Sequence, residues 1–304
     1  MLNIVFTFPG QGSQVPGMLQ DVPEYVKKAT SIIGSELRDD EEAMGSTVWI
    51  QMALFVKETA IAYRLIEQGI RPQFVAGHSI GAFPAAVIAG VLSFEDALRI
   101  VWLRARLMEE TFPEGYGMGV IIGLTQAEVQ QAVLLSHSEA TPVYLSNINA
   151  EQQIVVSGSL VGLNKAFMHV KELGTAKTAL LKVPIPSHSP LMSEVANKLL
   201  LKIHTFSLRD AQIPYLVNHT GRKTKAKEKI AEDLALNVAY PVRWMDMAAV
   251  CVESGADCFI EMPPGHTLSR LVKQAHKDTR QMAVDEIGLE ATQYLIRKWK
   301  EQEE

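Results

Sequence analysis

One stretch, residues 74–83, constrains the fold of this chain more than any other. It reads Phe-Val-Ala-Gly-His-Ser-Ile-Gly-Ala-Phe, so a short apolar run ends in a Gly-x-Ser-x-Gly motif, and an alanine-rich segment (82–92) follows. This order predicts a strand, a sharp turn and a helix, the context in which the motif presents a nucleophilic serine. The glycines tolerate the tight backbone that such a turn requires. We therefore expect Ser79 to be a nucleophile at the tip of the turn.

The helix after this turn predicts what kind of chemistry the serine performs. The first N–H groups of a helix lack partners within it, and its positive dipole end points toward the turn. If Ser79 attacks a carbonyl, the resulting oxyanion meets the backbone N–H of Ile80. The alternative is a chance match, because a five-residue pattern with two free positions recurs often. The strand before the motif and the helix after it favour the functional interpretation.

Length, composition and charge exclude several classes of protein. The 304 residues suffice for one large domain, or one with an insertion, and 47% apolar residues can fill a sizeable core. The net charge of −5 does not suit binding to nucleic acid or to an anionic membrane. Residues 1–8 resemble a first strand rather than a signal peptide, and no apolar run approaches the ~18 residues of a membrane span. We expect a cytoplasmic protein without nucleic-acid or membrane partners.

Cysteine spacing and one basic cluster add weaker constraints. Cys251 and Cys258 lie seven residues apart in an apolar stretch, a spacing that matches neither C-x-x-C nor a disulfide framework. We expect both to be reduced, buried thiols. The basic cluster, residues 222–227, is predicted to be a solvated loop, with contact to an acidic partner as the alternative. Its lysines are Lys223, Lys225 and Lys227.

The order of predicted elements indicates an α/β fold with a parallel sheet and an inserted α+β subdomain. The predicted strands of the larger part are 2–8, 73–76, 213–217 and 257–262, and its predicted helices are 24–37, 47–68, 94–110, 189–203, 229–237, 241–253 and 268–275. After the glycine-rich residues 115–119 break the pattern, a β-α-β-β-α-β order typical of a ferredoxin-like unit follows. We expect a hydrolase-like large subdomain (1–118 and 185–304) and a ferredoxin-like inserted subdomain (119–184). The charged tail 298–304 is expected to be an exposed helix end.

A serine nucleophile needs a base, and His188 is the best of the eight histidines. It follows Pro184 and Pro186, which restrict the backbone and leave the imidazole at a defined position. A histidine on a surface loop is the alternative. His78 is adjacent to Ser79, but adjacent residues on a turn seldom face each other well enough for proton transfer.

The acid of a Ser-His-acid triad is harder to find. No Asp or Glu stands out near a strand end in residues 84–187, where an α/β-hydrolase would carry it. A backbone carbonyl could orient the histidine instead, since the second ring N–H needs only an acceptor. Arg104 lies on the predicted helix 94–110, where the apolar pattern places it at an edge between the apolar and polar faces.

Ordered motifs along most of the chain resemble those of the malonyl-CoA:acyl carrier protein transacylases. The matching residues are Phe-Pro-Gly-Gln-Gly-Ser-Gln at 8–14, Gly-His-Ser-Ile-Gly at 77–81, Arg104 before 107–110, Asn-Ile-Asn at 147–149, 153–158, Pro-Ser-His at 186–188, Asn237 ahead of 241–244, and Pro263 with Gly265. The match extends to about residue 275. The resemblance implies a hydrolase-like subdomain with a ferredoxin-like insertion, malonyl transfer from malonyl-CoA to a carrier-protein thiol, and neither a metal nor a tightly bound cofactor.

The resemblance also implies a role for each matching site residue. Ser79 would be the nucleophile and His188 its general base. Gln11 and Ile80 would supply the oxyanion-hole N–H groups. Arg104 would hold the malonyl carboxylate, a task that suits a planar guanidinium. The main-chain carbonyl of Asn237 would orient the histidine in place of an acid.

Departures from the common pattern point to a particular member of the family. Ala82-Phe83 replaces the usual Glu-Tyr, and Ala105 replaces the glycine that usually follows the arginine. Four motifs together resemble the epsilon subunit of malonate decarboxylase: 6–12, 77–83, 115–119 and 261–266. This bacterial, cytosolic subunit charges the decarboxylase's own carrier subunit, which bears a phosphoribosyl-dephospho-coenzyme A group with a thiol. Ser187 does not distinguish malonyl from methyl-branched substrates.

Three alternatives stay open at this point. The first is a free-standing malonyl transacylase of fatty-acid or polyketide synthesis. The second is a serine hydrolase or thioesterase that releases the acyl group to water. The third is a non-catalytic subunit that binds a carrier protein through a vestigial site, against which intact Ser79, His188 and Arg104 argue.

Overall fold

Two β-sheets organise the chain in the computed structural model, which describes residues 2–112, 114–174 and 176–302. Six strands form the larger sheet, in the order β10-β9-β1-β2-β7-β8. Their bounds are Ile4–Phe8 (β1), Phe74–Gly77 (β2), Tyr215–Leu216 (β7), Lys223–Thr224 (β8), Cys258–Glu261 (β9) and Arg280–Ala283 (β10). Strands β10 to β7 run parallel, whereas the edge pair β7–β8 is antiparallel. The loops after β1 and β2 therefore leave the sheet at the same edge, where α/β proteins bind ligands.

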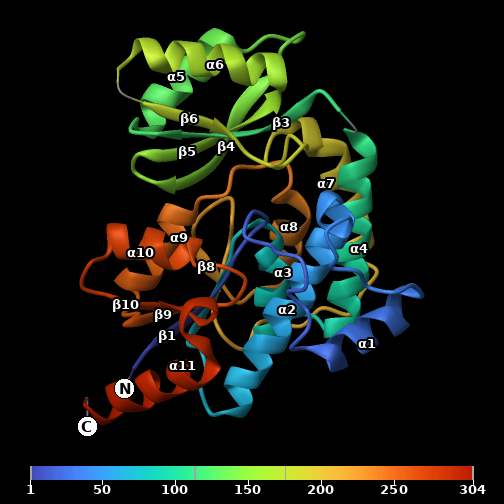
Figure 1. The fold of residues 1–304 in the computed structure, drawn as a ribbon, viewed down its shortest axis with the longest axis vertical. Helices are drawn as coiled ribbons and strands as arrows, with labels where there is room; N and C mark the ends of the chain where they lie inside the picture. Colours follow the sequence, from blue (N-terminus) through green and yellow to red (C-terminus); the bar gives the residue numbers. More distant parts are fainter. Residues whose placement is uncertain (1, 113, 175, 303–304) are drawn as a thin grey trace.

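Helices cover both faces of this sheet (Figure 1). They are α1 (Pro23–Ile33), α2 (Thr47–Glu67), α3 (Ala82–Ile88), α4 (Phe94–Thr111), α7 (Ser193–Ile203), α8 (Lys227–Leu236), α9 (Trp244–Glu253), α10 (Thr267–Ala275) and α11 (Val284–Glu301), with short 3-10 turns at Ala43–Gly45 (η1), Ser79–Gly81 (η2) and Pro190–Met192 (η3). Side chains alternate along β1, so Phe6 and Phe8 pack with α2, α3 and α4, while Val5 packs with α9 and α10. Burial on both faces explains the unbroken apolar character of β1.

The smaller sheet is antiparallel and lies above the larger one in Figure 1. Its strands are β3 (Tyr116–Ile122), β4 (Val143–Ala150), β5 (Gln153–Ser159) and β6 (Lys177–Leu180), and its helices are α5 (Gln126–Ser136) and α6 (Leu160–Glu172). The spatial order β4-β5-β3-β6 and the chain order β-α-β-β-α-β are those of a ferredoxin-like unit. The predicted fold class is thus confirmed; the exact limits 119–184 of the inserted subdomain stay a prediction.

The glycine-rich residues 115–119 follow the end of α4 at Thr111, so the helical pattern does break before them, but they belong to the next strand rather than preceding it. Strand β3 already begins at Tyr116 and contains Gly117 and Gly119. A Cβ atom at Gly119 would lie 2.4 Å from the ring of Phe167. Glycine is required there because α6 packs directly onto the strand.

Several other predicted boundaries differ from the structure. Helix α1 ends at Ile33 rather than at residue 37, since Gly34 adopts a left-handed conformation (φ 76°) that closes the helix. Strand β10 and most of α11 were not predicted, because β10 is a four-residue edge strand of mixed polarity. The predicted tail covers the end of α11, and its residues 303–304 lie outside the described residues.

The two cysteines and the basic cluster have different outcomes. Cys251 and Cys258 are buried and unpaired, as predicted. Residues 222–227 are not simply a loop, because they contain β8 and the start of α8. Lys223 Nζ donates a hydrogen bond to Ser254 Oγ, and Lys225 Nζ donates one to the carbonyl of Gln212. Contact with an acidic partner stays a prediction. None of the helices in the described part of the chain is long and apolar enough to cross a membrane.

Candidate active site

Ser79 lies on a tight turn between β2 and α3, as the motif predicts. The turn is a 3-10 segment, and Ser79 adopts the left-handed conformation with φ 57°. A Cβ atom at Gly77 would lie 2.0 Å from the carbonyl oxygen of Gly81, and one at Gly81 would lie 2.2 Å from that of Phe8. Both glycines are therefore required by close backbone contacts. Such a strained serine is typical of a nucleophile elbow.

His188 lies beside this serine although 109 residues separate the two in the chain. Its Nε2 is 2.8 Å from Ser79 Oγ, and its Nδ1 forms a hydrogen bond with the main-chain carbonyl of Asn237. A carbonyl only accepts, so Nδ1 carries the proton and Nε2 is free to accept one from the serine hydroxyl. The side-chain pair therefore has the geometry of a nucleophile and its base.

Burial sets the protonation state of this histidine. His188 is 2% exposed, and desolvation, with a smaller contribution from the nearby Arg104 charge, lowers its pKa to about 3. The imidazole is consequently neutral at pH 7, as a general base must be.

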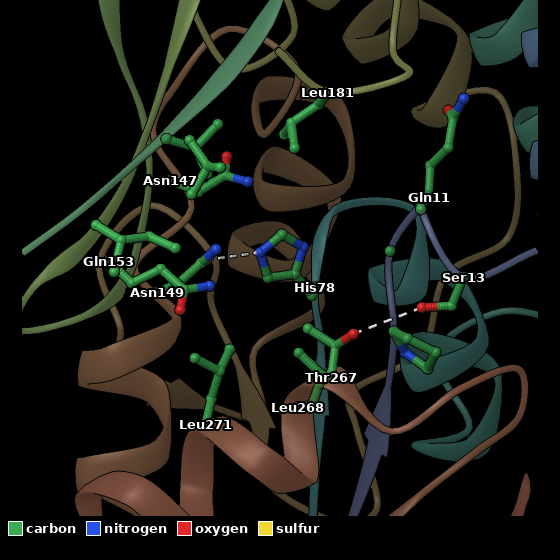
Figure 2. A pocket seen from close by; sticks show the side chains of 16 residues that line it. Gln11, Ser13, His78, Asn147, Asn149, Gln153, Leu181, Thr267, Leu268 and Leu271 are labelled. Atoms are coloured by element: carbon green, nitrogen blue, oxygen red, sulfur yellow. Dashed lines mark hydrogen bonds between the residues drawn. The ribbon is translucent and has the colours of Figure 1, made fainter. Parts of the chain in front are cut away.

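His78 does not compete for this role. Figure 2 shows its ring facing Asn149, and its Nε2 lies 3.2 Å from Asn149 Oδ1. Burial lowers its pKa to about 4, so it too is neutral at pH 7. The hydrogen bond turns His78 toward the small subdomain, in agreement with the expectation that adjacent turn residues do not face each other.

Arg104 is the third polar group at the serine. Its Nη2 lies 3.3 Å from Ser79 Oγ and 3.5 Å from Asn237 Oδ1. The prediction that it occupies the edge of its helix is wrong, because α4 is covered by α1, α2, α3 and α7 and leaves Arg104 only 1% exposed. Desolvation lowers its pKa to about 9, so the guanidinium is still charged at pH 7.

No carboxylate balances this buried charge within the described part of the chain. Arg104 takes part in none of the ion pairs found there, and its Nε atom is buried without a hydrogen-bond partner. A buried charge is ordinarily paired, because removing it from water is costly. A guanidinium without a carboxylate partner beside the Ser79 hydroxyl suits an anionic substrate group.

Two residues that no sequence motif identified hold these groups in place. Gln51 on α2 accepts a hydrogen bond from Arg104 Nη1, and Asn218, which follows β7, accepts one from the Ser79 N–H at 3.0 Å. Both are buried polar residues. The available signals were a glutamine within the apolar helix 47–68 and an asparagine at the end of the strand 213–217. Neither signal identifies its partner, because the contacts form between distant segments.

Two neighbouring cavities lie at this site, and Ser79 lines the smaller one. The smaller, of about 60 Å³, is lined by Ser79, Ile80, Arg104, His188 and residues of both subdomains, including Met118 and Val183. The larger, of about 280 Å³ (Figure 2), is lined by the loop after β1, by the N-terminal end of α10 and by β3 and β5. Four residues line both cavities: Gln11, His78, Asn147 and Leu181. The smaller cavity thus lies next to a wider one between the two sheets.

All six predicted site residues are placed in this region. Ser79, His188, Arg104 and the backbone of Asn237 are in direct contact, while Gln11 and Ile80 line the cavity around them. Among the residues that the structure describes, no cluster of His, Cys, Asp or Glu is arranged to hold a metal ion. The described site brings together a serine hydroxyl, a neutral imidazole and a buried cation, a set of groups that suits acyl chemistry on an anionic substrate.

Comparison with known proteins agrees with this chemistry. Residues 5–289 match the model of the acyl transferase domain family. The chain is 34% identical to the malonyl CoA-acyl carrier protein transacylase of Bacillus subtilis, over 94% of each chain, and 33% identical to that of Staphylococcus aureus, over 92% of this chain and 94% of the relative.

Solved structures show the same relationship. The malonyl CoA-acyl carrier protein transacylase of Clostridium perfringens superposes with a TM-score of 0.90 at 29% identity, covering 99% of this chain and 98% of that one. A malonyl-transacylase in complex with its type II PKS acyl-carrier protein superposes with a TM-score of 0.88 at 32% identity, covering 93% and 96%. This chain belongs to the acyl transferase family, and it is an acyltransferase.

Proposed function

We propose that this chain is a malonyl-CoA:acyl carrier protein transacylase, which moves malonyl from CoA to a carrier-protein thiol through an ester on Ser79. The names of the relatives support this substrate pair. The observation that carries the proposal is Arg104, a buried, unneutralised cation 3.3 Å from the serine hydroxyl. Malonyl carries a free carboxylate one methylene away from its thioester carbonyl. A guanidinium beside the nucleophile can therefore hold that carboxylate while the carbonyl lies over Ser79.

The reaction consists of two half-reactions, the acylation of Ser79 by malonyl-CoA and the transfer of malonyl to the carrier thiol. His188 Nε2 takes the hydroxyl proton as Ser79 Oγ attacks the thioester carbonyl, and the N–H groups of Gln11 and Ile80 hold the oxyanion. The C–S bond then breaks, and His188 returns the proton to the departing CoA thiolate. The carrier's thiol, bound through a CoA-derived prosthetic group, enters next and gives its proton to His188 as it attacks the malonyl ester. Ser79 recovers the proton when it leaves.

The carbonyl of Asn237 fills the place of the triad's acid. It fixes the tautomer of His188 by accepting the Nδ1 proton, which is the orienting task of that acid. The wider cavity provides a route by which the thiol-bearing arm of CoA, and then that of the carrier, reaches Ser79. The enzyme needs no metal or bound cofactor for these steps, since the substrate's thioester is already activated.

The relatives favour the free-standing alternative over the malonate decarboxylase assignment. None of the relatives reported above is described as a decarboxylase subunit, and the Bacillus subtilis transacylase matches over 94% of its own length. One structural match is a malonyl-transacylase bound to a type II PKS acyl-carrier protein. We therefore propose a free-standing transacylase that serves fatty-acid or polyketide synthesis. Offering malonyl-enzyme to carrier proteins of these systems and to a decarboxylase carrier would decide the pathway.

The proposed function is tested by substituting Arg104. In Arg104→Ala, uptake of malonyl from malonyl-CoA should fall at least ~100-fold, because a charge-assisted bidentate contact is lost, while uptake of acetyl should fall far less. The matched control is Arg106→Ala on the same helix, whose guanidinium is exposed and paired with Glu110. It should leave the malonyl-to-acetyl ratio unchanged. An unchanged ratio in Arg104→Ala would refute the substrate assignment.

A second measurement separates transfer from hydrolysis. A transacylase holds the malonyl ester until a thiol arrives, whereas a hydrolase releases free malonate continuously from malonyl-CoA alone. Steady malonate release without an acceptor thiol, at a rate similar to that of transfer, would favour the hydrolase alternative.

A further inference from the structure

A buried aspartate on α8, Asp233, is held close to the nucleophile although it touches neither Ser79 nor His188. Asp233 is 0% exposed, and its carboxylate accepts four hydrogen bonds. The donors are Tyr215 Oη (2.7 Å), the Asn218 N–H (2.8 Å), Asn218 Nδ2 (3.0 Å) and His219 Nδ1 (3.2 Å). Two of the four donors belong to Asn218, so the carboxylate of Asp233 holds both the backbone and the side chain of this residue.

These two hydrogen bonds determine which way the side-chain amide of Asn218 points. A carboxylate only accepts hydrogen bonds, so the NH₂ group of Asn218 must face Asp233 and its oxygen must face the other way. That oxygen accepts the hydrogen bond from the Ser79 N–H at 3.0 Å. A reversed amide would place NH₂ against N–H and leave both donors unpaired.

The Ser79 N–H is a sensitive place for such a contact. Ser79 has φ 57°, a conformation that residues other than glycine adopt only where surrounding contacts enforce it. Its N–H is held by Asn218, and its carbonyl oxygen lies 3.5 Å from Asn237 Nδ2. The contacts to Asn218 and Asn237 therefore hold the backbone of the nucleophile on both sides.

The same helical turn also positions the base. Asn237 is one turn beyond Asp233, and its N–H donates to the Asp233 carbonyl. The carbonyl of Asn237 in turn accepts the Nδ1 proton of His188. One turn of α8 thus connects to the nucleophile through Asp233 and Asn218, and to the base through Asn237.

We propose that Asp233 is a positioning residue: by orienting the Asn218 amide, it holds Ser79 at the place where His188 can remove its proton. This inference rests on the proposed acyl transfer through Ser79. Neither Asp233 nor Asn218 lines the two cavities at the serine, so they act on the chemical step and not on the binding of substrate.

The test is an exchange of the two side chains. Asp233→Asn removes the group that orients Asn218, and Asn218→Asp places two carboxylates against each other. Each should slow the acylation of Ser79 at saturating malonyl-CoA about tenfold or more, with little change in KM. The double variant Asn218→Asp/Asp233→Asn restores a donor–acceptor pair of reversed polarity and an acceptor for the Ser79 N–H. It should recover most of the lost rate.

Tyr215→Phe is the matched control, because it removes a donor to the same carboxylate but no link to Ser79. It should lower the melting temperature and leave the acylation rate near that of the wild type. If Asp233→Asn fails to fold, Asn218→Ala and the double variant make the same comparison. Three results would each overturn the proposal. The first is a wild-type acylation rate in a folded Asp233→Asn protein, and the second is an equally large loss of acylation rate in Tyr215→Phe. The third is a double variant that is as slow as the single variants.

A fluorophosphonate probe of serine reactivity keeps this test separate from the proposed function. The probe needs no malonyl, so its labelling rate on Ser79 reports positioning even if malonyl-CoA proves not to be the substrate. Slower labelling in Asp233→Asn than in wild type or Tyr215→Phe supports the positioning role; equal labelling in all three refutes it. Failure of wild-type enzyme to accept malonyl would refute the proposed function alone.

Discussion

Replacing Glu58 by methionine should stabilise this protein, because the structure leaves this carboxyl group without compensation. Glu58 lies within α2, is 0% exposed, and neither of its side-chain oxygens has a hydrogen-bond partner in the described part of the chain. Burial, with a further contribution from the charge of Glu261, raises its pKa well above the ordinary value of 4.5. Methionine has a similar length, favours helices and brings no polar atom that needs a partner.

The expected increase in the free energy of unfolding has one part that is the same at every pH and one part that depends on pH. Burying an unpaired polar group costs about 1–3 kcal/mol, and Glu58→Met removes this cost at every pH. Below pH 4.5 the carboxyl is protonated in both the folded and the unfolded state. Above that value the unfolded chain loses the proton while the folded chain keeps it, so wild-type stability falls by up to about 1.4 kcal/mol per pH unit until the folded pKa is reached. The stabilisation by Glu58→Met should therefore be larger at pH 8 than at pH 5.

Urea unfolding followed by tryptophan fluorescence measures this difference. Glu67→Met is the matched control, since Glu67 is exposed at the end of the same helix and should change the free energy of unfolding by less than about 0.5 kcal/mol at either pH. The reasoning would be refuted if Glu58→Met were less stable than the wild type, or if the substitution stabilised the protein by the same amount at pH 5 and at pH 8.

Two further predictions concern the site. The rate of malonyl uptake at low malonyl-CoA concentration should not change with pH around neutrality. It should fall at acidic pH, because His188 becomes protonated with its pKa of about 3. It should also fall at alkaline pH, because Arg104 loses its proton near its pKa of about 9. The alkaline fall should be absent with acetyl-CoA, and its presence there would contradict the role of Arg104. Gln51→Leu removes the acceptor for Arg104 Nη1 and should raise the KM for malonyl-CoA about tenfold with a smaller effect on kcat. Initial rates over a range of malonyl-CoA concentrations check this, and an unchanged KM would show that Gln51 does not hold the guanidinium.

The parts of the site that could be predicted are those that depend on local sequence. Strand, turn and helix follow each other directly around Ser79, so the elbow and its required glycines were readable from ten residues. The order of strands and helices likewise predicted the ferredoxin-like insertion. Prolines before His188 indicated a defined position, and resemblance to a family supplied its partner Asn237.

The parts that could not be predicted arise from packing between distant segments. The burial of Arg104 depends on helices that cover α4 from several sides, which a periodic pattern within one helix does not reveal. Gln51 and Asn218 are ordinary polar residues until the fold brings them to Arg104 and Ser79. Asp233 is further removed still, because its connection to the serine passes through the side chain of Asn218.

The central claim is that malonyl passes through an ester on Ser79, and intact-protein mass spectrometry with peptide mapping tests it most directly. After incubation with malonyl-CoA, the account predicts one malonyl group on the peptide that contains Ser79, lost on addition of a thiol-bearing carrier protein and absent in Ser79→Ala. A malonyl adduct that persists in Ser79→Ala, or a wild-type protein that transfers malonyl to the carrier without ever carrying it, would contradict the account.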